Sequence, residues 1–222
     1  MPRVADYAFL FQKSFGFSGV NAIGSFQLSQ LNSRSVQAQL KAAGIDTNSK
    51  QYKAVIKQMM SSGNSAMYGN IQGIKNMMRR YDKDGDYINP VNGLAGLLMT
   101  DENASSRKRI ISIPDSSKEE MFELTKKEFL RENGVHNGDT TKRSDVYVNL
   151  YRKMPKKDRL AAGYTLDKYE RIYRQALYDA AKKADPNWEL GKQIKAGALD
   201  SVTRESAEAG KTPEQMVVDM KI

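Results

Sequence analysis

Apolar residues recur at helical spacing along most of the chain after residue 33. Tyr52, Val55, Ile56 and Met59 follow the i, i+3, i+4, i+7 pattern, which a helix of 3.6 residues per turn places on one face. The longest apolar stripe covers residues 165–185. The pattern predicts helices over residues 33–44, 47–63, 71–81, 94–98, 116–134, 141–153, 165–185 and 213–220.

Several of these helices carry signals for their first turn. Thr47–Ser49 is typical of a helix start, and Gln51 is placed to complete a capping box there. Ser116 and Ser117, followed by two glutamates, indicate the start of the helix over residues 116–134.

One segment has the composition of a strand. Ile110–Ile113 is short, rich in β-branched residues and bounded by Pro114. It could pair with Tyr87–Asn89 in a small ribbon. The sequence therefore predicts an all-α, mainly helical fold of seven to nine helices, with at most one small two-stranded β ribbon.

The first 32 residues differ from the rest of the chain. Phe9, Phe11, Phe15, Phe17 and Phe26 alternate with glycine, serine and other uncharged residues, and no long helical period is present. Exposed phenylalanine rings are unfavourable in water, and docking each one gains about 2–3 kcal/mol. We expect residues 1–32 to form an apolar N-terminal arm, residues 33–200 a helical domain, and residues 201–222 a C-terminal tail with a short helix.

Composition narrows the classes of function. The chain has 222 residues, of which 40% are hydrophobic and 27% charged, as in a globular protein with a sizeable core. It has no cysteine, which excludes thiol nucleophiles, disulfides and cysteine-based metal sites. The single histidine, His136, lies in a glycine- and asparagine-rich stretch and is expected to be an exposed loop residue. No signature of a nucleotide-binding loop, dinucleotide fold or zinc protease is present, so we predict that the protein is not an enzyme and needs no cofactor.

No apolar run is long enough to span a membrane, and the N-terminus lacks the apolar core of a signal peptide. A cytoplasmic location is the default expectation, and export without a cleaved leader is the alternative.

The formal net charge is +9, with the excess spread over small clusters. One cluster consists of Lys153, Lys156, Lys157 and Arg159. Basic clusters attract anionic polymers such as nucleic acid or cell-surface polymers. Acidic residues flank most of these clusters, so solvated helix faces are the favoured interpretation.

Asp82, Asp84 and Asp86 have the alternate spacing that begins a calcium-binding EF-hand loop. The glycine and the final glutamate that such a loop requires are missing. A turn whose aspartates accept backbone hydrogen bonds is the favoured interpretation, and a weak Ca²⁺ site is the alternative.

Several stretches resemble an uncharacterised family of low-GC Gram-positive bacterial proteins, known only as a domain of unknown function. They are Gly44–Tyr52, Tyr81–Asn89, Arg109–Asp139 and Thr141–Trp188, the last with its Arg159–Gly163 step. The resemblance covers about residues 40–205. It implies a bacterial origin and brings no activity, cofactor or site residue.

The leading hypothesis is a non-enzymatic bacterial interaction protein whose arm docks on a neighbouring copy or on a protein partner. The alternatives are a basic module that binds an anionic polymer and a membrane-active protein.

Overall fold

The structure is a computed structural model that describes residues 25–61, 68–100, 103–135, 138 and 140–218. The chain divides into two compact units, Met1–Leu98 (unit 1) and Met99–Ile222 (unit 2). The boundary lies inside residues 33–200, which the sequence groups into one domain. Helical periodicity continues on both sides of the boundary, so the sequence pattern does not indicate where the chain divides.

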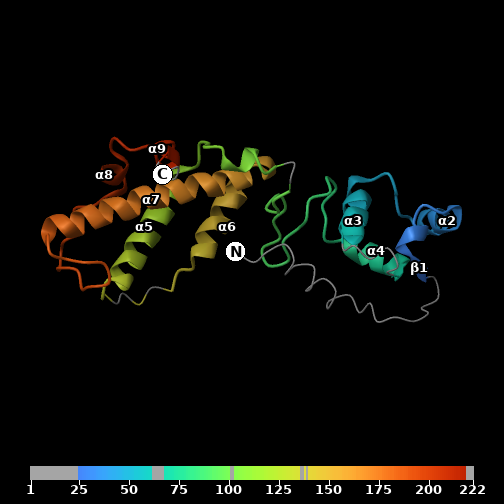
Figure 1. Cartoon of the computed structure of the whole chain (residues 1–222), viewed down its shortest axis with the longest axis horizontal. Coiled ribbons are helices and arrows are strands. Elements are labelled where there is room, and N and C mark those ends of the chain that lie inside the picture. The colour runs from blue at the N-terminus through green and yellow to red at the C-terminus, as the bar shows by residue number, and fades with distance from the viewer. Residues whose placement is uncertain (1–24, 62–67, 101–102, 136–137, 139, 219–222) are drawn as a thin grey trace. The chain divides into compact units, whose positions relative to one another are not determined.

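Unit 1 packs three helices and a short β ribbon around one core (Figure 1). Its elements are β1 (Ser25–Gln27), the 3-10 helix η1 (Leu28–Gln30), α2 (Arg34–Ala42), α3 (Lys50–Ser61), β2 (Tyr68–Asn70) and α4 (Ile71–Met78). Leu40, Val55 and Ile74 are fully buried, one from each helix. The apolar positions that predicted these helices therefore form the core.

The ribbon was predicted in the wrong place. β1 pairs antiparallel with β2, with Phe26 opposite Gly69. Ile110–Ile113 is not a strand, and its backbone at Ile111 donates to the Thr165 hydroxyl instead. Tyr87 makes only an isolated bridge with Tyr81. The sequence does not predict this ribbon because β1 and β2 are each only three residues long and are separated by about 40 residues of chain.

The first turn of α3 is tied to the last turn of α4. Ser49 caps α3, since its hydroxyl accepts from the Tyr52 amide at 3.1 Å. Gln51 does not complete the predicted capping box. Its side-chain amide donates to the carbonyl oxygens of Met78 at 2.7 Å and Tyr81 at 2.6 Å. The glutamine thus satisfies carbonyl groups that the end of α4 leaves without helical partners.

The helix predicted over residues 94–98 does not form. Gly93 and Gly96 have φ angles of +71° and +77°, which a right-handed helix does not contain. The side-chain oxygens of Asn89 and Asn92 accept from the amides of Val91 and Leu94, as asparagines do in turns. The leucines in this segment belong to a series of turns.

Unit 2 is built around one long helix, α7, which packs against most of its other elements (Figure 1). The elements are the 3-10 helix η2 (Ser106–Lys108), α5 (Asp115–Glu132), α6 (Arg143–Lys153), the 3-10 helix η3 (Lys156–Asp158), α7 (Arg159–Ala184), α8 (Arg204–Glu208) and α9 (Gln215–Val218). In the view of Figure 1, α5 and α6 lie below α7, and α8 and α9 above it. Helices α2 to α9 of the described residues confirm the mainly helical fold and fall within the predicted number.

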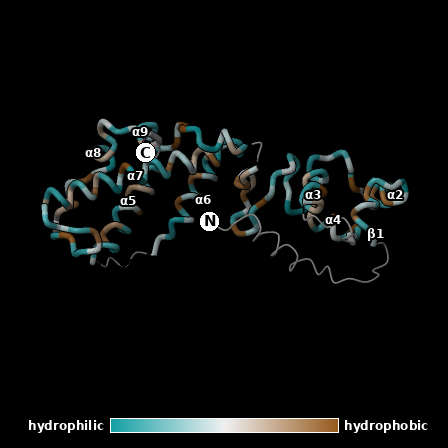
Figure 2. Tube along the Cα trace, viewed as in Figure 1, coloured by the Kyte–Doolittle hydropathy of each residue, from teal (hydrophilic) through white to brown (hydrophobic). Residues whose placement is uncertain are grey.

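The core of unit 2 comes from the apolar faces of α5, α6 and α7. Met121, Leu150, Leu166, Ile172 and Leu177 have no exposed surface. Each of these helices contains both hydrophobic and hydrophilic residues, which follow one another along its turns (Figure 2). Among the described residues, no helix is both long enough and apolar enough to cross a membrane.

Two helix starts in unit 2 differ from their predicted positions. α5 begins at Asp115, after Pro114, and no side chain caps it. Ser117 is buried inside the helix, so it is not the expected cap. α7 begins at Arg159 and passes through Gly163 without a break. A Cβ atom at position 163 would lie 2.4 Å from the Tyr151 hydroxyl, so the glycine allows α6 to approach α7 closely.

An ion-pair network joins α5, α6 and α7 on their polar sides. Arg143 of α6 pairs with both Glu128 of α5 and Glu170 of α7. Arg174 of α7 pairs with Glu170 at 3.0 Å and with Glu132 at 2.8 Å. The hydrogen bond from Arg174 lowers the pKa of Glu132 below its ordinary value. These charged groups fix how the three helices sit together, and with them the groove between α5 and α6.

Candidate functional site

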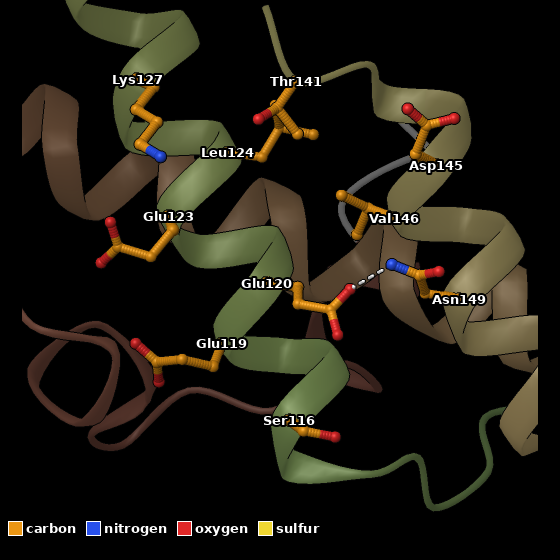
Figure 3. A pocket seen from close by; sticks show the side chains of 10 residues that line it. All are labelled: Ser116, Glu119, Glu120, Glu123, Leu124, Lys127, Thr141, Asp145, Val146 and Asn149. Atoms are coloured by element: carbon orange, nitrogen blue, oxygen red, sulfur yellow. Dashed lines mark hydrogen bonds between the residues drawn. The ribbon is translucent and has the colours of Figure 1, made fainter. Parts of the chain in front are cut away.

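A cleft of about 480 Å³ lies between α5 and α6 (Figure 3). The α5 residues that line it are spaced three or four positions apart, which places them on one face of that helix. The α6 residues also share one face. The lining consists of Ser116, Glu119, Glu120, Glu123, Leu124, Lys127, Thr141, Asp145, Val146 and Asn149.

Polar contacts close one end of the cleft. Glu120 accepts from the Asn149 amide at 3.1 Å, the bond drawn in Figure 3, and from the Lys153 ammonium at 3.0 Å. Lys153 also donates to the Ser116 hydroxyl at 3.1 Å. Because Glu120 is already paired with a cation, this end of the cleft serves to hold α6 against α5.

Glu119, on the same face of α5, is engaged by the C-terminal part of unit 2. It accepts from Arg204 of α8 at 2.8 Å, and Arg204 also pairs with Glu208 at 3.2 Å. Glu208 in turn accepts from the Tyr173 hydroxyl at 2.7 Å. Burial, with this hydrogen bond to a carboxylate, raises the pKa of Tyr173. Glu119 therefore has a structural role in holding α8 on α5.

The two remaining carboxylates, Glu123 and Asp145, are exposed and make no ion pair with the described residues. Glu123 comes from α5 and Asp145 from α6, and in Figure 3 the Glu123 carboxylate points to the side of α5 away from α6. Between them lie the side chains of Leu124 and Val146, which belong mostly to the buried core beneath. The open part of the cleft thus combines an apolar floor with a rim of charged side chains, namely Glu123, Lys127 and Asp145.

This arrangement suits binding of a segment that has both apolar and polar side chains. Lys127, one turn after Glu123 on α5, also lines the cleft, so its rim carries charges of both signs, and the apolar floor gains from contact with a ring or an aliphatic chain. Within the described residues, no three acidic or histidine side chains are gathered so that they could hold a metal ion. Among the described residues, the carboxylates that line the cleft are therefore not grouped as the ligands of a metal site would be.

Of the five arm phenylalanines, only Phe26 lies within the described residues. It is 5% exposed and packs in the core of unit 1 with Leu28 and Leu31. Phe9, Phe11, Phe15 and Phe17 lie outside the described residues, as does His136. The end of the predicted arm is therefore part of unit 1.

The aspartate cluster forms a tight turn. Asp82 Oδ1 accepts from the amides of Asp84 at 2.9 Å and Asp86 at 3.0 Å. Gly85 has a φ angle of +86° and donates to the Asp82 carbonyl oxygen. One carboxylate oxygen thus accepts two backbone hydrogen bonds, as the favoured turn interpretation predicts, and the alternative of a weak Ca²⁺ site remains untested.

The basic cluster is divided between structural and exposed positions. Lys153 is paired with Glu120, and Arg159 donates to the Tyr151 carbonyl oxygen at 3.0 Å. Lys157 is exposed. Asp158, at the centre of the cluster, pairs with Arg109 at 2.8 Å, which brings a second basic stretch, residues 107–109, to the same corner of unit 2.

The sequence alone did not indicate the cleft. The polar spacing of Glu119, Glu120 and Glu123 shows that α5 has a polar face, but not which helix lies beside it. The Ser116–Glu120 stretch predicts the start of a helix. The same residues also line the cleft, which the helix-start signal does not indicate. Only the packing of α6 turns the face into a groove.

Comparison with known proteins identifies a family and no activity. A search of curated proteins and a search of solved structures each found no match. A family model described as a domain of unknown function, DUF3879, matches residues 45–222. The matched region contains α3, α4 and all of unit 2, while the arm, β1 and α2 lie outside it. The chain therefore belongs to the DUF3879 family.

Proposed function

We propose that the protein is a non-enzymatic interaction protein that self-assembles, with its phenylalanine-rich arm docking on a neighbouring copy. The resemblance of its sequence stretches supports the further proposal of a low-GC Gram-positive bacterial source. The observation that carries the proposal is the burial of Phe26 at the root of the arm.

Phe26 connects the arm to a fixed point on unit 1. Its ring lies across β2 at Gly69, where a Cβ atom would be 3.5 Å from Phe26 Cε2 and 3.4 Å from Met59 Cε. The absence of a side chain at Gly69 leaves the space that the ring uses. Four further phenylalanines precede this anchor within residues 9–17, and each gains about 2–3 kcal/mol by docking on a protein surface.

The charged groups of unit 2 support binding rather than chemistry. Glu119 and Glu120 are paired with arginine and lysine, and Glu128, Glu132 and Glu170 belong to the ion-pair network. Their contacts hold helices together. Glu123 and Asp145, which make no ion pair with the described residues, remain exposed at the cleft.

Removing two arm rings tests the proposal. In the full-length chain, Phe11→Ser with Phe15→Ser is expected to reduce the mass measured by light scattering from that of an oligomer to the 24.9 kDa of one chain. The loss of two docked rings weakens association by a factor of more than a hundred, since each 1.4 kcal/mol is tenfold.

Val91→Ser is the matched control, because Val91 is apolar and 92% exposed yet lies outside the arm. It should leave the mass unchanged. A monomeric unmodified chain, or an unchanged mass for the double arm variant, would contradict self-assembly through the arm.

A second candidate function is binding of an anionic polymer at the basic corner of unit 2. The observation that favours it is the Arg109–Asp158 ion pair, which joins two basic stretches that lie 49 residues apart in the sequence. Lys108 and Lys157 are both exposed there. A phosphate-ester backbone would be attracted to this corner, and the attraction would weaken steeply with salt.

Charge reversal tests this second candidate. Lys108→Glu with Lys157→Glu is expected to abolish retention of labelled double-stranded DNA at 50 mM salt and to flatten its salt dependence. Lys192→Glu with Lys195→Glu, a pair of exposed lysines elsewhere in unit 2, is the control with the same change in charge. Equal binding by both variants, or no binding by the unmodified chain, would remove this candidate.

A further inference from the structure

We infer that the exposed face of α3 is a second contact for the phosphate backbone of a nucleic acid, with Lys53 and Lys57 meeting its phosphate groups. This inference rests on the second candidate function, binding of an anionic polymer at the basic corner of unit 2. It adds a surface in unit 1 to that function and names the class of polymer. The segregation of charge in unit 1 carries it.

The helices of unit 1 carry positive charge alone. α2, α3 and α4 contain six lysines and arginines and no aspartate or glutamate. In unit 2, by contrast, each helix from α5 to α8 has residues of both signs, and many of them pair, as in the network around Arg143. The acidic residues that balance the helix faces of unit 2 are therefore missing from the helices of unit 1.

Three lysines of α3 lie on the side of the helix opposite the core. The buried residues of α3 are Tyr52, Val55 and Met59. Lys50, Lys53 and Lys57 are exposed, and their spacing of three and four positions places them on one face. With 3.6 residues per turn, this face lies across the helix axis from the buried residues.

Negative charge in unit 1 is gathered at the N-terminal end of α3. The acidic residues between positions 25 and 98 are Asp46, Asp82, Asp84 and Asp86. Asp46 lies in the connection that precedes α3. The turn formed by the other three lies against Lys50, since a Cβ atom at Gly85 would be 2.9 Å from the Lys50 carbonyl oxygen. Lys53 and Lys57 are about one and two turns beyond this end, and Lys53 makes no ion pair with the described residues.

The chemistry of this face favours a phosphate backbone over a protein or a membrane. Lysine is depleted from protein–protein interfaces, whereas nucleic-acid interfaces are rich in positive charge. A helix that lies in a membrane surface turns an apolar face outward. The apolar face of α3 is buried in the core of unit 1, and a single exposed methionine, Met60, does not replace it.

The spacing of the two lysines fits separate phosphate groups. Lys53 and Lys57 are four residues apart, which is about 6 Å along the helix axis. A DNA duplex carries one charge per about 1.7 Å of its axis, or about three charges over this length. Two such contacts are too few to retain a nucleic acid without the basic corner. A nucleic acid presents phosphates along its whole length, so one molecule can meet both surfaces.

The salt dependence of binding measures the number of phosphate contacts. In the full-length chain, Lys53→Gln with Lys57→Gln is expected to weaken binding of labelled double-stranded DNA about tenfold or more at 50 mM salt. The slope of log affinity against log salt should become shallower by about 1.8, since each lost contact accounts for about 0.9. Fluorescence anisotropy over a salt series measures both quantities. Double-stranded RNA of the same length is measured alongside, and the affinities of the unmodified chain for the two probes distinguish DNA from RNA as the ligand.

A matched variant controls for the change in net charge. Lys192→Gln with Lys195→Gln removes two exposed positive charges in unit 2 and should leave the slope unchanged. Circular dichroism should show the same helix content for both variants and the unmodified chain, since lysine and glutamine are both good helix formers. Equal losses of slope in the two variants would mean that α3 is not a specific contact, and would overturn the inference.

The remaining outcomes separate the inference from the second candidate function. If Lys53→Gln with Lys57→Gln keeps the affinity and slope of the unmodified chain while Lys108→Glu with Lys157→Glu loses binding, the inference fails and the second candidate stands. No binding of DNA or RNA by the unmodified chain would overturn both. If the unmodified chain instead sediments with phosphatidylglycerol vesicles, and only the α3 variant does not, the face belongs to a membrane contact and the inference is wrong.

Discussion

Replacing Phe26 with alanine is expected to unfold unit 1 under conditions in which unit 2 stays folded. The ring is 5% exposed and belongs to the core that includes Leu28, Leu31 and Met59. Removing a buried phenylalanine ring costs about 3–5 kcal/mol, because contacts are lost and a cavity remains. A folded unit of about 74 residues has a total stability of only about 4–11 kcal/mol.

Hydrogen exchange followed by mass spectrometry measures the effect on each unit separately. In Phe26→Ala, amides of α3 and α4 should exchange much faster than in the unmodified chain, while amides of α5 and α7 keep their protection. Phe26→Leu is the matched control, since leucine fills most of the same space and should cost about 1 kcal/mol.

The comparison also separates anchoring from docking. The arm variant Phe11→Ser with Phe15→Ser should change the oligomeric mass and leave the exchange of unit 1 as it is. If Phe26→Ala leaves the exchange of α3 and α4 unchanged, the ring does not hold β1 to the core, and the observation that carries the proposed function is lost.

The helices were predictable from the sequence because their information is local. The apolar stripe of α7 repeats over seven turns, and its residues Leu166, Ile172 and Leu177 are buried as the period requires. Its start was missed because Gly163 is a poor helix former. The close approach of Tyr151 gives that glycine a packing role that no local rule contains.

The ribbon and the cleft were not predictable because each depends on contacts between distant residues. β1 has three residues, and η1, α2 and α3 lie between it and its partner β2 in the chain. The charged rim depends on which face of α5 lies beside α6, and the Arg143 ion pairs that set this packing join residues 15 and 27 positions apart. The period of apolar residues shows which face of a helix is buried, but not which other helix packs against that face.

The aspartate turn is the second place where a single substitution should have a large effect. Gly85→Ala is expected to destabilise unit 1 by about 3 kcal/mol or more. At a φ of +86°, a Cβ atom at position 85 would lie 2.9 Å from the Lys50 carbonyl oxygen. Left-handed backbone alone costs a residue with a Cβ about 1–2 kcal/mol.

The clash adds to this cost because neither side can move easily. Lys50 is the first residue of α3, and Gln51 ties this turn of the helix to the carbonyl oxygens of Met78 and Tyr81. To relieve the contact, the loop would have to give up the hydrogen bonds that Asp82 Oδ1 accepts from Asp84 and Asp86. Each such bond contributes about 1 kcal/mol.

Gly93→Ala is the matched control for this prediction. Gly93 is in the same unit and has a φ of +71°, but a Cβ atom there would meet nothing within 4 Å. The Gly93→Ala substitution should therefore cost only the free energy of placing a residue with a Cβ atom in left-handed backbone. Chemical denaturation of Gly85→Ala and Gly93→Ala measures the difference between their free energies of unfolding. Equal losses for Gly85→Ala and Gly93→Ala would mean that the loop does not press against α3. The Asp82 turn would then be an independent surface loop and not part of the packing that holds α3 against α4.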